Sequence, residues 1–288
     1  MTTQLHPSTA LGHVHLTVSY LARSIAFYER SLGFKVHRQE GDTAWLGAGG
    51  RDLLVLTEQA GATHYPRRTG LYHFAILTPS RLHLALVLRN FIQTETQLSG
   101  WSDHLVSEAI YLSDPDGNGI EIYRDRPRAD WPREADGSLK MASDPLDYQG
   151  ILGELDGASG VNAPWEGLHP DTILGHMHLH VADIPVTKVF YRDVIGFDFL
   201  LDFGDQAAFF SAGGYHHHLG TNTWNGRGAP PPPPDATGLR YFTVELADGG
   251  ERENLIARLE AAGHAYEARE DGLFVNDPAR NGILFATP

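Results

Sequence analysis

The chain contains two copies of one long sequence pattern. Residues 11–16 read Leu-Gly-His-Val-His-Leu, and residues 174–179 read Leu-Gly-His-Met-His-Leu. After each copy, a Phe-Tyr pair, a Gly-Phe pair and a Gly-Asp pair follow in the same order. A second segment repeats as well, since Asp-Pro-Asp-Gly-Asn-Gly-Ile-Glu at 114–121 returns as Asp-Pro-Ala-Arg-Asn-Gly-Ile-Leu at 277–284. Repetition on this scale indicates a duplicated architecture, so the fold must be one that can be assembled from equivalent modules.

The two copies differ in the residues that can bind a metal. The first half has His73 and Glu121, whereas the second half has Tyr241 and Leu284 at the matching places. We therefore expect the first half to carry the chemistry and the second half to be a degenerate copy.

Composition restricts the class of protein. The length of 288 residues suits about two domains. No apolar run approaches the ~20 residues that cross a bilayer, and the N-terminal residues lack the basic and apolar regions of a signal peptide. Because the chain has no Cys, a metal would need imidazole and carboxylate ligands. The formal charge of −14 argues against a nucleic-acid surface. We expect a cytoplasmic protein that acts on a small molecule, with no membrane or nucleic-acid partner.

Apolar periodicity divides each half into two units that combine strands with one helix. The alternation over 11–18 predicts a strand with His13, His15 and Thr17 on one face. A helical pattern follows over 21–32, and Gly33 is a suitable C-cap. Three short strands complete a βαβββ module, and three further modules repeat the arrangement. The four modules span residues 11–57, 71–124, 173–222 and 238–287.

A segment of different composition separates the two halves. Residues 127–172 are rich in Pro, Asp, Gly and Arg, with one short helix predicted at 146–155. We interpret them as a connector between an N-terminal domain, residues 1–126, and a C-terminal domain, residues 173–288.

These motifs together resemble a known family. Leu-Gly-His at the start of a module, Phe-Tyr in its helix and Asp-Pro-Asp-Gly-Asn-Gly-Ile-Glu at its close are similar to the vicinal oxygen chelate superfamily of glyoxalases, bleomycin resistance proteins and extradiol dioxygenases. Four modules in one chain resemble the catechol 2,3-dioxygenase type of extradiol ring-cleaving dioxygenase. The resemblance implies an α+β fold in which four βαβββ modules pair into two domains with curved, cup-like mixed sheets. In the best-known extradiol enzymes the metal lies in the C-terminal pair of modules, whereas the residues of this chain place the intact metal site in modules one and two.

The resemblance implies a ligand set for that metal. One His comes from the first strand of each of two modules and a Glu from a last strand, which here are His13, His73 and Glu121. Two imidazoles and one carboxylate on one face are typical of non-haem Fe(II) oxygenases. The expected cofactor is Fe(II), with Mn(II) as an alternative, and the expected reactants are a catechol-type aromatic diol and O2. His15 competes with His13, because both side chains lie on one strand face.

Two further residues match the family's proton-handling positions. The family places a Tyr ten residues before the Glu ligand, and Tyr111 occupies that place. It also places a His in a His-Gly-Val-Ser context, which His104-Leu-Val-Ser resembles with Leu in place of Gly. Catechol cleavage needs proton transfer, so Tyr111 and His104 are the expected catalytic residues. His64 is a weaker candidate for a further acid–base His.

The second half is rich in His, which leaves two interpretations open. A second metal could be bound by His176 with His216 or His218, which alternation places on one face of the last strand of module three. The interpretation that we favour is a buried polar network or an interface, because two of the expected ligands are missing there.

The expected function is therefore extradiol cleavage of a catechol. A glyoxalase-type isomerase is one alternative, but it usually has two carboxylate ligands, and no acid lies within residues 53–57 where the second would stand. A metal-free binding or resistance protein is the other alternative. A homo-oligomer is common in the family, and the sequence does not decide it.

Overall fold

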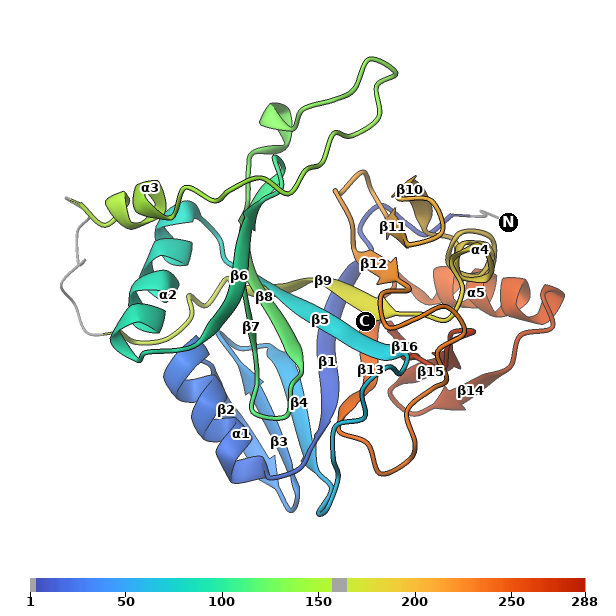
Figure 1. Cartoon of the computed structure of the whole chain (residues 1–288). Coiled ribbons are helices and arrows are strands. Elements are labelled where there is room, and N and C mark those ends of the chain that lie inside the picture. The colour runs from blue at the N-terminus through green and yellow to red at the C-terminus, as the bar shows by residue number, and fades with distance from the viewer. Residues whose placement is uncertain (1–3, 157–164, 288) are drawn as a thin grey trace. The chain divides into compact units, whose positions relative to one another are not determined.

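The chain forms two mixed eight-stranded sheets in the computed structural model, which describes residues 4–156 and 165–287 (Figure 1). The first sheet has the spatial order β14 (Tyr266–Arg269), β15 (Gly272–Asn276), β16 (Gly282–Ala286), β13 (Gly238–Glu245), β1 (Ala10–Val18), β4 (Asp52–Glu58), β3 (Thr43–Gly47) and β2 (Lys35–Glu40). The second has the order β10 (Asp198–Asp202), β11 (Ala207–Ser211), β12 (Leu219–Asn222), β9 (Ile173–His180), β5 (Gly70–Leu77), β8 (Gly119–Asp125), β7 (Ser107–Ser113) and β6 (Leu98–Asp103). The fold is thus the expected α+β arrangement of βαβββ modules.

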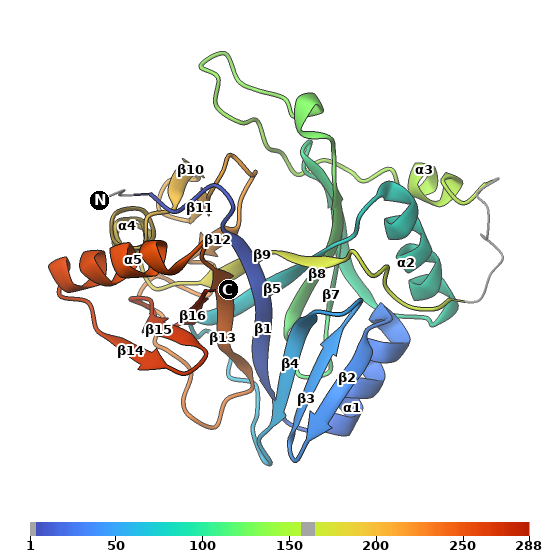
Figure 2. The same cartoon turned by 180° about the vertical axis from the view of Figure 1, so that it is seen from behind.

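Each module contributes one main helix. These are α1 (Leu21–Phe27), α2 (Arg81–Gln93), α4 (Ile184–Lys188) and α5 (Gly249–Ala261). Short π-helical segments, Tyr28–Leu32 and Val189–Ile195, prolong α1 and α4, and each ends at a glycine with a positive φ, Gly33 at 76° and Gly196 at 99°. Glycine adopts this left-handed conformation without a Cβ penalty, so the predicted C-cap at Gly33 is confirmed. Figure 2 shows α1 beside the antiparallel strands β4, β3 and β2.

The modules do not pair as the sequence suggested. We expected the two modules of each half to share a sheet. Instead, the first sheet joins module one to module four, and the second joins module two to module three. The pairing is made by the first strands of the modules, as in the antiparallel contact of β1 with β13 that places Val14 opposite Phe242. All four first strands have a similar pattern, so the sequence alone could not distinguish the partners.

Backbone contacts divide the chain into two compact units. One consists of Met1–Thr17, Gly61–Phe74 and Gly175–Pro288, and the other of Val18–Ala60 and Ala75–Leu174. These boundaries do not follow the expected division around the connector 127–172, because the first strands of modules one and two belong with the C-terminal modules. Of the expected connector, residues 157–164 lie outside the described residues. Its short helix is α3 (Tyr148–Gly153), preceded by a 3-10 turn, Arg128–Asp130.

One strand, β6, was not predicted from the sequence. β6 carries the sequence Leu-Ser-Gly-Trp-Ser-Asp, which has little apolar alternation, and it is the edge strand of its sheet. Apart from the buried Ser102, its residues are exposed or half-buried, so this edge strand need not show the period of two that identifies buried strands. Among the described residues, no helix is long and apolar enough to span a membrane.

A buried Tyr–Asp pair occurs at equivalent places in the two halves. The Tyr28 hydroxyl donates to the Asp114 carboxylate at 3.0 Å, and the Tyr191 hydroxyl donates to Asp277 at the same distance. Asp114 also accepts hydrogen bonds from the backbone N–H groups of Asp116 and Asn118, so it organises the turn before β8. Burial raises the pKa of Asp114 and, reinforced by Asp114, raises that of Tyr28 well above its usual value. The Tyr of each repeated Phe-Tyr pair and the first Asp of each repeated Asp-Pro motif therefore stabilise the fold.

We predict that Tyr28→Phe lowers the free energy of unfolding by about 1–3 kcal/mol, because it removes one of the hydrogen bonds that compensate a buried carboxylate. Thermal or urea unfolding followed by circular dichroism measures the change. Tyr20→Phe is the matched control, since Tyr20 is 56 % exposed and should unfold like the wild type. Equal stability of the two variants would contradict the structural role of the pair.

Candidate metal centre

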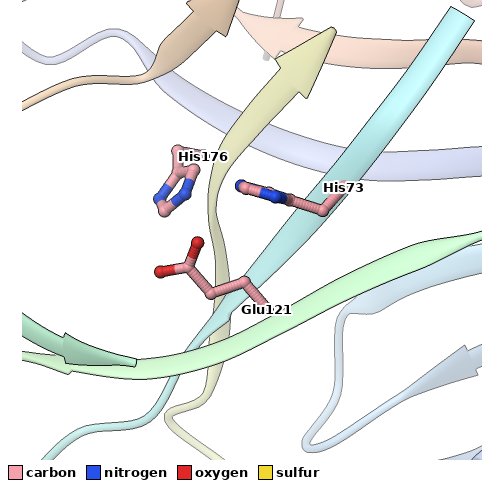
Figure 3. A group of neighbouring side chains, drawn as sticks. All are labelled: His73, Glu121 and His176. Carbon is pink, nitrogen blue, oxygen red and sulfur yellow. The ribbon is translucent and has the colours of Figure 1, made fainter. Parts of the chain in front are cut away.

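Three side chains that can bind a metal come from neighbouring strands of the second sheet. His176 lies on β9, His73 on β5 and Glu121 on β8, and these strands are adjacent in the order β9-β5-β8. One ligand atom from each residue lies within 4.8 Å of the others. Figure 3 shows the two imidazole rings and the carboxylate pointing toward one another. We call these three residues the triad.

The chemistry of the triad suits a metal ion. All three residues are buried, with exposed fractions of 6 % for His73, 2 % for Glu121 and 1 % for His176. A buried carboxylate is costly unless a cation or hydrogen-bond donors compensate its charge. Two imidazoles and one carboxylate provide three ligands and leave further coordination positions for reactants. The arrangement can therefore hold a divalent metal with open positions.

The structure does not bring His13 into this group. His13 lies on β1 in the first sheet, 3.4 Å from the Thr243 hydroxyl, with its ring 5.8 Å from the ring of Tyr241. His176 stands in its place, and both residues follow Leu-Gly in the repeated motif. Because β5 has β9 and not β1 as its sheet neighbour, the His of the second copy of the motif lies beside His73 in the structure.

His15 and His64, the two weaker candidates, also lie outside the triad. The ring of His15 is 5.0 Å from that of Tyr241. Burial, together with nearby Arg240 and His13, lowers the pKa of His15 to about 3, so its ring is neutral at neutral pH. His64 lies exposed in the segment before β5.

The His cluster of module three does not form a second group of ligands. His216, His217 and His218 precede β12 and are not part of it. His216 and His217 are buried and bond to each other through their Nδ1 atoms at 2.9 Å, and the His217 ring lies 4.1 Å from that of His176. Within residues 4–156 and 165–287, the triad is the only group in which three or more ligand-bearing side chains lie close enough to hold one ion. The buried hydrogen bond between His216 and His217 is consistent with the polar network that we favoured.

Aromatic rings surround the His residues of the triad. The ring of His178, two residues after His176 on β9, lies 5.0 Å from His73 and 5.0 Å from Tyr72. Trp224 contacts both His178 and Tyr72, at ring distances of 5.5 and 5.1 Å. Such packing fixes the imidazole orientations on β9 and β5.

Tyr111 is the cross-strand neighbour of Glu121. In the antiparallel pair β7–β8, Tyr111 stands directly opposite Glu121, so both side chains project from the same face of the sheet. Tyr111 also packs against the buried cluster of Ala75, Ala109 and Tyr123. The phenol is thereby directed along the face that carries the Glu of the triad.

His104 contacts Tyr111 directly. Its Nε2 lies 2.7 Å from the Tyr111 hydroxyl, and its Nδ1 lies 2.7 Å from the carbonyl oxygen of Ala142. The residue after it, Leu105, has a φ of 69°, a conformation that costs a branched residue about 1–2 kcal/mol. The family that this motif resembles has Gly at the position of Leu105. Gly suits this position because it adopts a positive φ without a Cβ penalty.

Comparisons with known proteins agree with this architecture. The model of the Glyoxalase/Bleomycin resistance protein/Dioxygenase superfamily matches residues 10–122 and 173–281. A protein of Bacillus subtilis (strain 168) named catechol-2,3-dioxygenase is 45 % identical over 286 residues, which cover 98 % of each chain.

Two solved structures share the fold at low sequence identity. One, from Bacillus subtilis subsp. subtilis str. 168, has a TM-score of 0.65 and 12 % identity, and the match covers 99 % of this chain and 86 % of that one. The other, glyoxalase I from Zea mays, has a TM-score of 0.57 and 16 % identity, with 97 % and 92 % covered. By its repeated modules and by these matches, the chain belongs to the glyoxalase/bleomycin resistance protein/dioxygenase superfamily.

Proposed function

We propose that the protein is an extradiol ring-cleaving dioxygenase that acts on a catechol-type aromatic diol with Fe(II) and O2. The observation that carries the proposal is the 45 % identity, over nearly the full length of both chains, with a Bacillus subtilis protein named catechol-2,3-dioxygenase. The triad supports it, because two His and one carboxylate are the ligand set of non-haem Fe(II) oxygenases.

The triad residues His73, Glu121 and His176 would hold the metal. When bound, Fe(II) would supply a centre at which both diol oxygens and O2 can be brought together. Mn(II) would fit the same donor set, since imidazole and carboxylate bind both ions. This ligand set differs from the one expected from the sequence only in that His176 replaces His13.

The Tyr111–His104 pair would handle protons. The carbonyl of Ala142 can only accept, so Nδ1 of His104 carries a proton, and Nε2 of the neutral ring then accepts from the Tyr111 hydroxyl. Tyr111, on the same sheet face as Glu121, would hold a diol oxygen by hydrogen bonding, and His104 would take up or return the proton.

A glyoxalase-type isomerase is the second candidate, since glyoxalase I from Zea mays shares the fold. In such a site a second carboxylate ligand would come from the last strand of the other module. Here that strand is β12, with the sequence Leu-Gly-Thr-Asn, which contains no acid. The single carboxylate of the triad therefore favours the dioxygenase. It also disfavours a metal-free binding protein, which would need no triad.

Composition supports a small-molecule substrate in a cytoplasmic setting. The net charge of −14 disfavours nucleic acid, and the absence of Cys leaves nothing for an oxidising compartment to cross-link. A homo-oligomer remains our expectation from the family resemblance.

We predict that His176→Ala and Glu121→Ala reduce the bound metal from about one per chain to near zero, because each removes one of three ligands. His13→Ala should keep its metal. Metal content after anaerobic Fe(II) loading is measured by plasma mass spectrometry, with circular dichroism as the check on folding. Loss of metal from His13→Ala, with retention in His176→Ala, would place the centre on β1 and refute the triad.

We expect the Fe(II)-loaded protein to convert catechol in air into a yellow ring-cleavage product, detected by its near-ultraviolet to visible absorbance. Glu121→Ala should give no colour. If the wild-type protein binds one iron per chain but gives no colour with catechol, the substrate would be another diol or the protein would be the isomerase. Colourless mixtures without bound iron would favour the metal-free binding protein.

Tyr111→Phe and His104→Gln should each lower kcat by about 100-fold with the metal still bound, as expected for loss of one proton-transfer group. The double variant should lose little more, because the two residues act as one unit. Steady-state kinetics and metal analysis provide the measurements. His64→Gln is the matched His control. A loss of kcat in that variant equal to the loss in His104→Gln would identify His64 as the acid–base residue.

A further inference from the structure

His104 is held at both ring nitrogens, and one of its partners belongs to the connector. Nε2 meets the Tyr111 hydroxyl at 2.7 Å, while Nδ1 meets the carbonyl oxygen of Ala142 at 2.7 Å. A carbonyl accepts only, so this contact determines which nitrogen of neutral His104 carries the proton. Ala142 lies in a stretch of chain that neither βαβββ module of the N-terminal half requires.

The connector is hydrogen-bonded to the loop that carries His104. The backbone N–H of Asp103 donates to the carbonyl of Asp144 at 2.9 Å, and the N–H of Asp144 donates to the carbonyl of Asp103 at 2.9 Å. The N–H of Ala142 donates to the carbonyl of His104 at 3.4 Å. Residues 142–144 thus form a short antiparallel bridge at the end of β6, and we call them the clamp.

Both sides of the clamp are fastened to module two. Before the clamp, the N–H of Arg126 donates to the carbonyl of Val106 at 2.8 Å, and its guanidinium pairs with Asp103 at 2.6 Å. After the clamp, Arg81 of α2 pairs with Glu154 at 3.1 Å. These contacts stabilise the path of the connector against the loop, so the Ala142 carbonyl is presented at a defined place.

We propose that the clamp is a positioning element for proton transfer: the carbonyl of Ala142 fixes His104 in the tautomer whose Nε2 accepts the proton of Tyr111. The inference rests on the proposed function, in which these two residues handle the protons of the diol. The connector is then part of the active centre as well as a link between the halves.

The consequence follows from hydrogen-bond chemistry. With Nδ1 as the donor, Nε2 has a free lone pair that faces the Tyr111 hydroxyl. Without the carbonyl, the neutral ring can adopt the other tautomer, with the proton on Nε2. In that form His104 donates to Tyr111 and cannot take its proton, so the pair loses its base.

Asp144→Pro tests the proposal, because proline lacks the N–H that bonds to the Asp103 carbonyl. Protein labelled with 15N-His and loaded with diamagnetic Zn(II) reports the tautomer by NMR, with the His104 signals assigned by their loss in His104→Gln. We expect the Nδ1–H pattern in the wild type and loss of that pattern in Asp144→Pro. For the Fe(II) enzyme, kcat for catechol should fall about tenfold or more, with KM and metal content unchanged.

The matched control is Lys140→Pro. The N–H of Lys140 donates to the carbonyl of Pro132 at 2.9 Å, a connector hydrogen bond of the same length that does not involve loop 103–105. This variant should keep the wild-type tautomer and kcat. Equal loss of kcat in both proline variants would reduce the connector to a general structural role and overturn the proposal.

A second variant covers the case in which Asp144→Pro does not fold. Replacing Ser143 by its α-hydroxy acid turns the Ala142 carbonyl into an ester carbonyl, a weaker acceptor, without changing a side chain. An unchanged tautomer and kcat in this protein would overturn the proposal. Failure of the wild type to cleave any diol would count against the proposed function alone, because the tautomer is read without substrate.

Discussion

The pairing of first strands is the constraint on which the rest of the structure depends. Each βαβββ module exposes the edge of its first strand and needs a partner there, because unpaired backbone groups at a sheet edge are costly to bury and prone to association. The sheet neighbours β9, β5 and β8 place His176, His73 and Glu121 on adjacent strands. The first sheet, in which β1 adjoins β13, has Tyr241 and Thr243 facing His13 instead. One choice of partner therefore decides which sheet carries the complete ligand set.

The repeated residues divide into those that build the module and those that perform chemistry. Tyr28 with Asp114, and Tyr191 with Asp277, keep the same buried hydrogen bond in both halves, because in each half this bond joins the helical segment of one module to the turn before the last strand of the next module. Glu121, by contrast, differs between the two halves. Its equivalent in the second half, Leu284, is an apolar residue buried in the core, so the module accepts a side chain without a carboxylate at this place.

Much of this could be anticipated from residue patterns, and the failures have definite causes. The strand predicted at 11–18 agrees with β1, and the helix predicted at 21–32 agrees with α1 and the π-helical segment that prolongs it, since both have strong apolar periodicity. β6 was missed because an exposed edge strand carries little alternation. His73, Glu121, Tyr111 and His104 were predicted as site residues from their motifs, while the contact between Tyr111 and His104 appears only in the structure. His176 was assigned to a hypothetical second site, because local sequence does not show which strand adjoins β5.

The sequence by itself determined the duplicated α+β architecture, the superfamily and the kind of residue that meets a metal, because these depend on local periodicity and short motifs. Tertiary structure decided which Leu-Gly-His motif joins the triad and what surrounds the Tyr111–His104 pair. Both depend on contacts between segments far apart in the chain, the strand pairing of β5 with β9 and the bridge from residues 142–144 to loop 103–105. A hydrogen bond to a backbone carbonyl, such as that of Ala142, leaves no mark in the side-chain sequence, so only the folded chain reveals it.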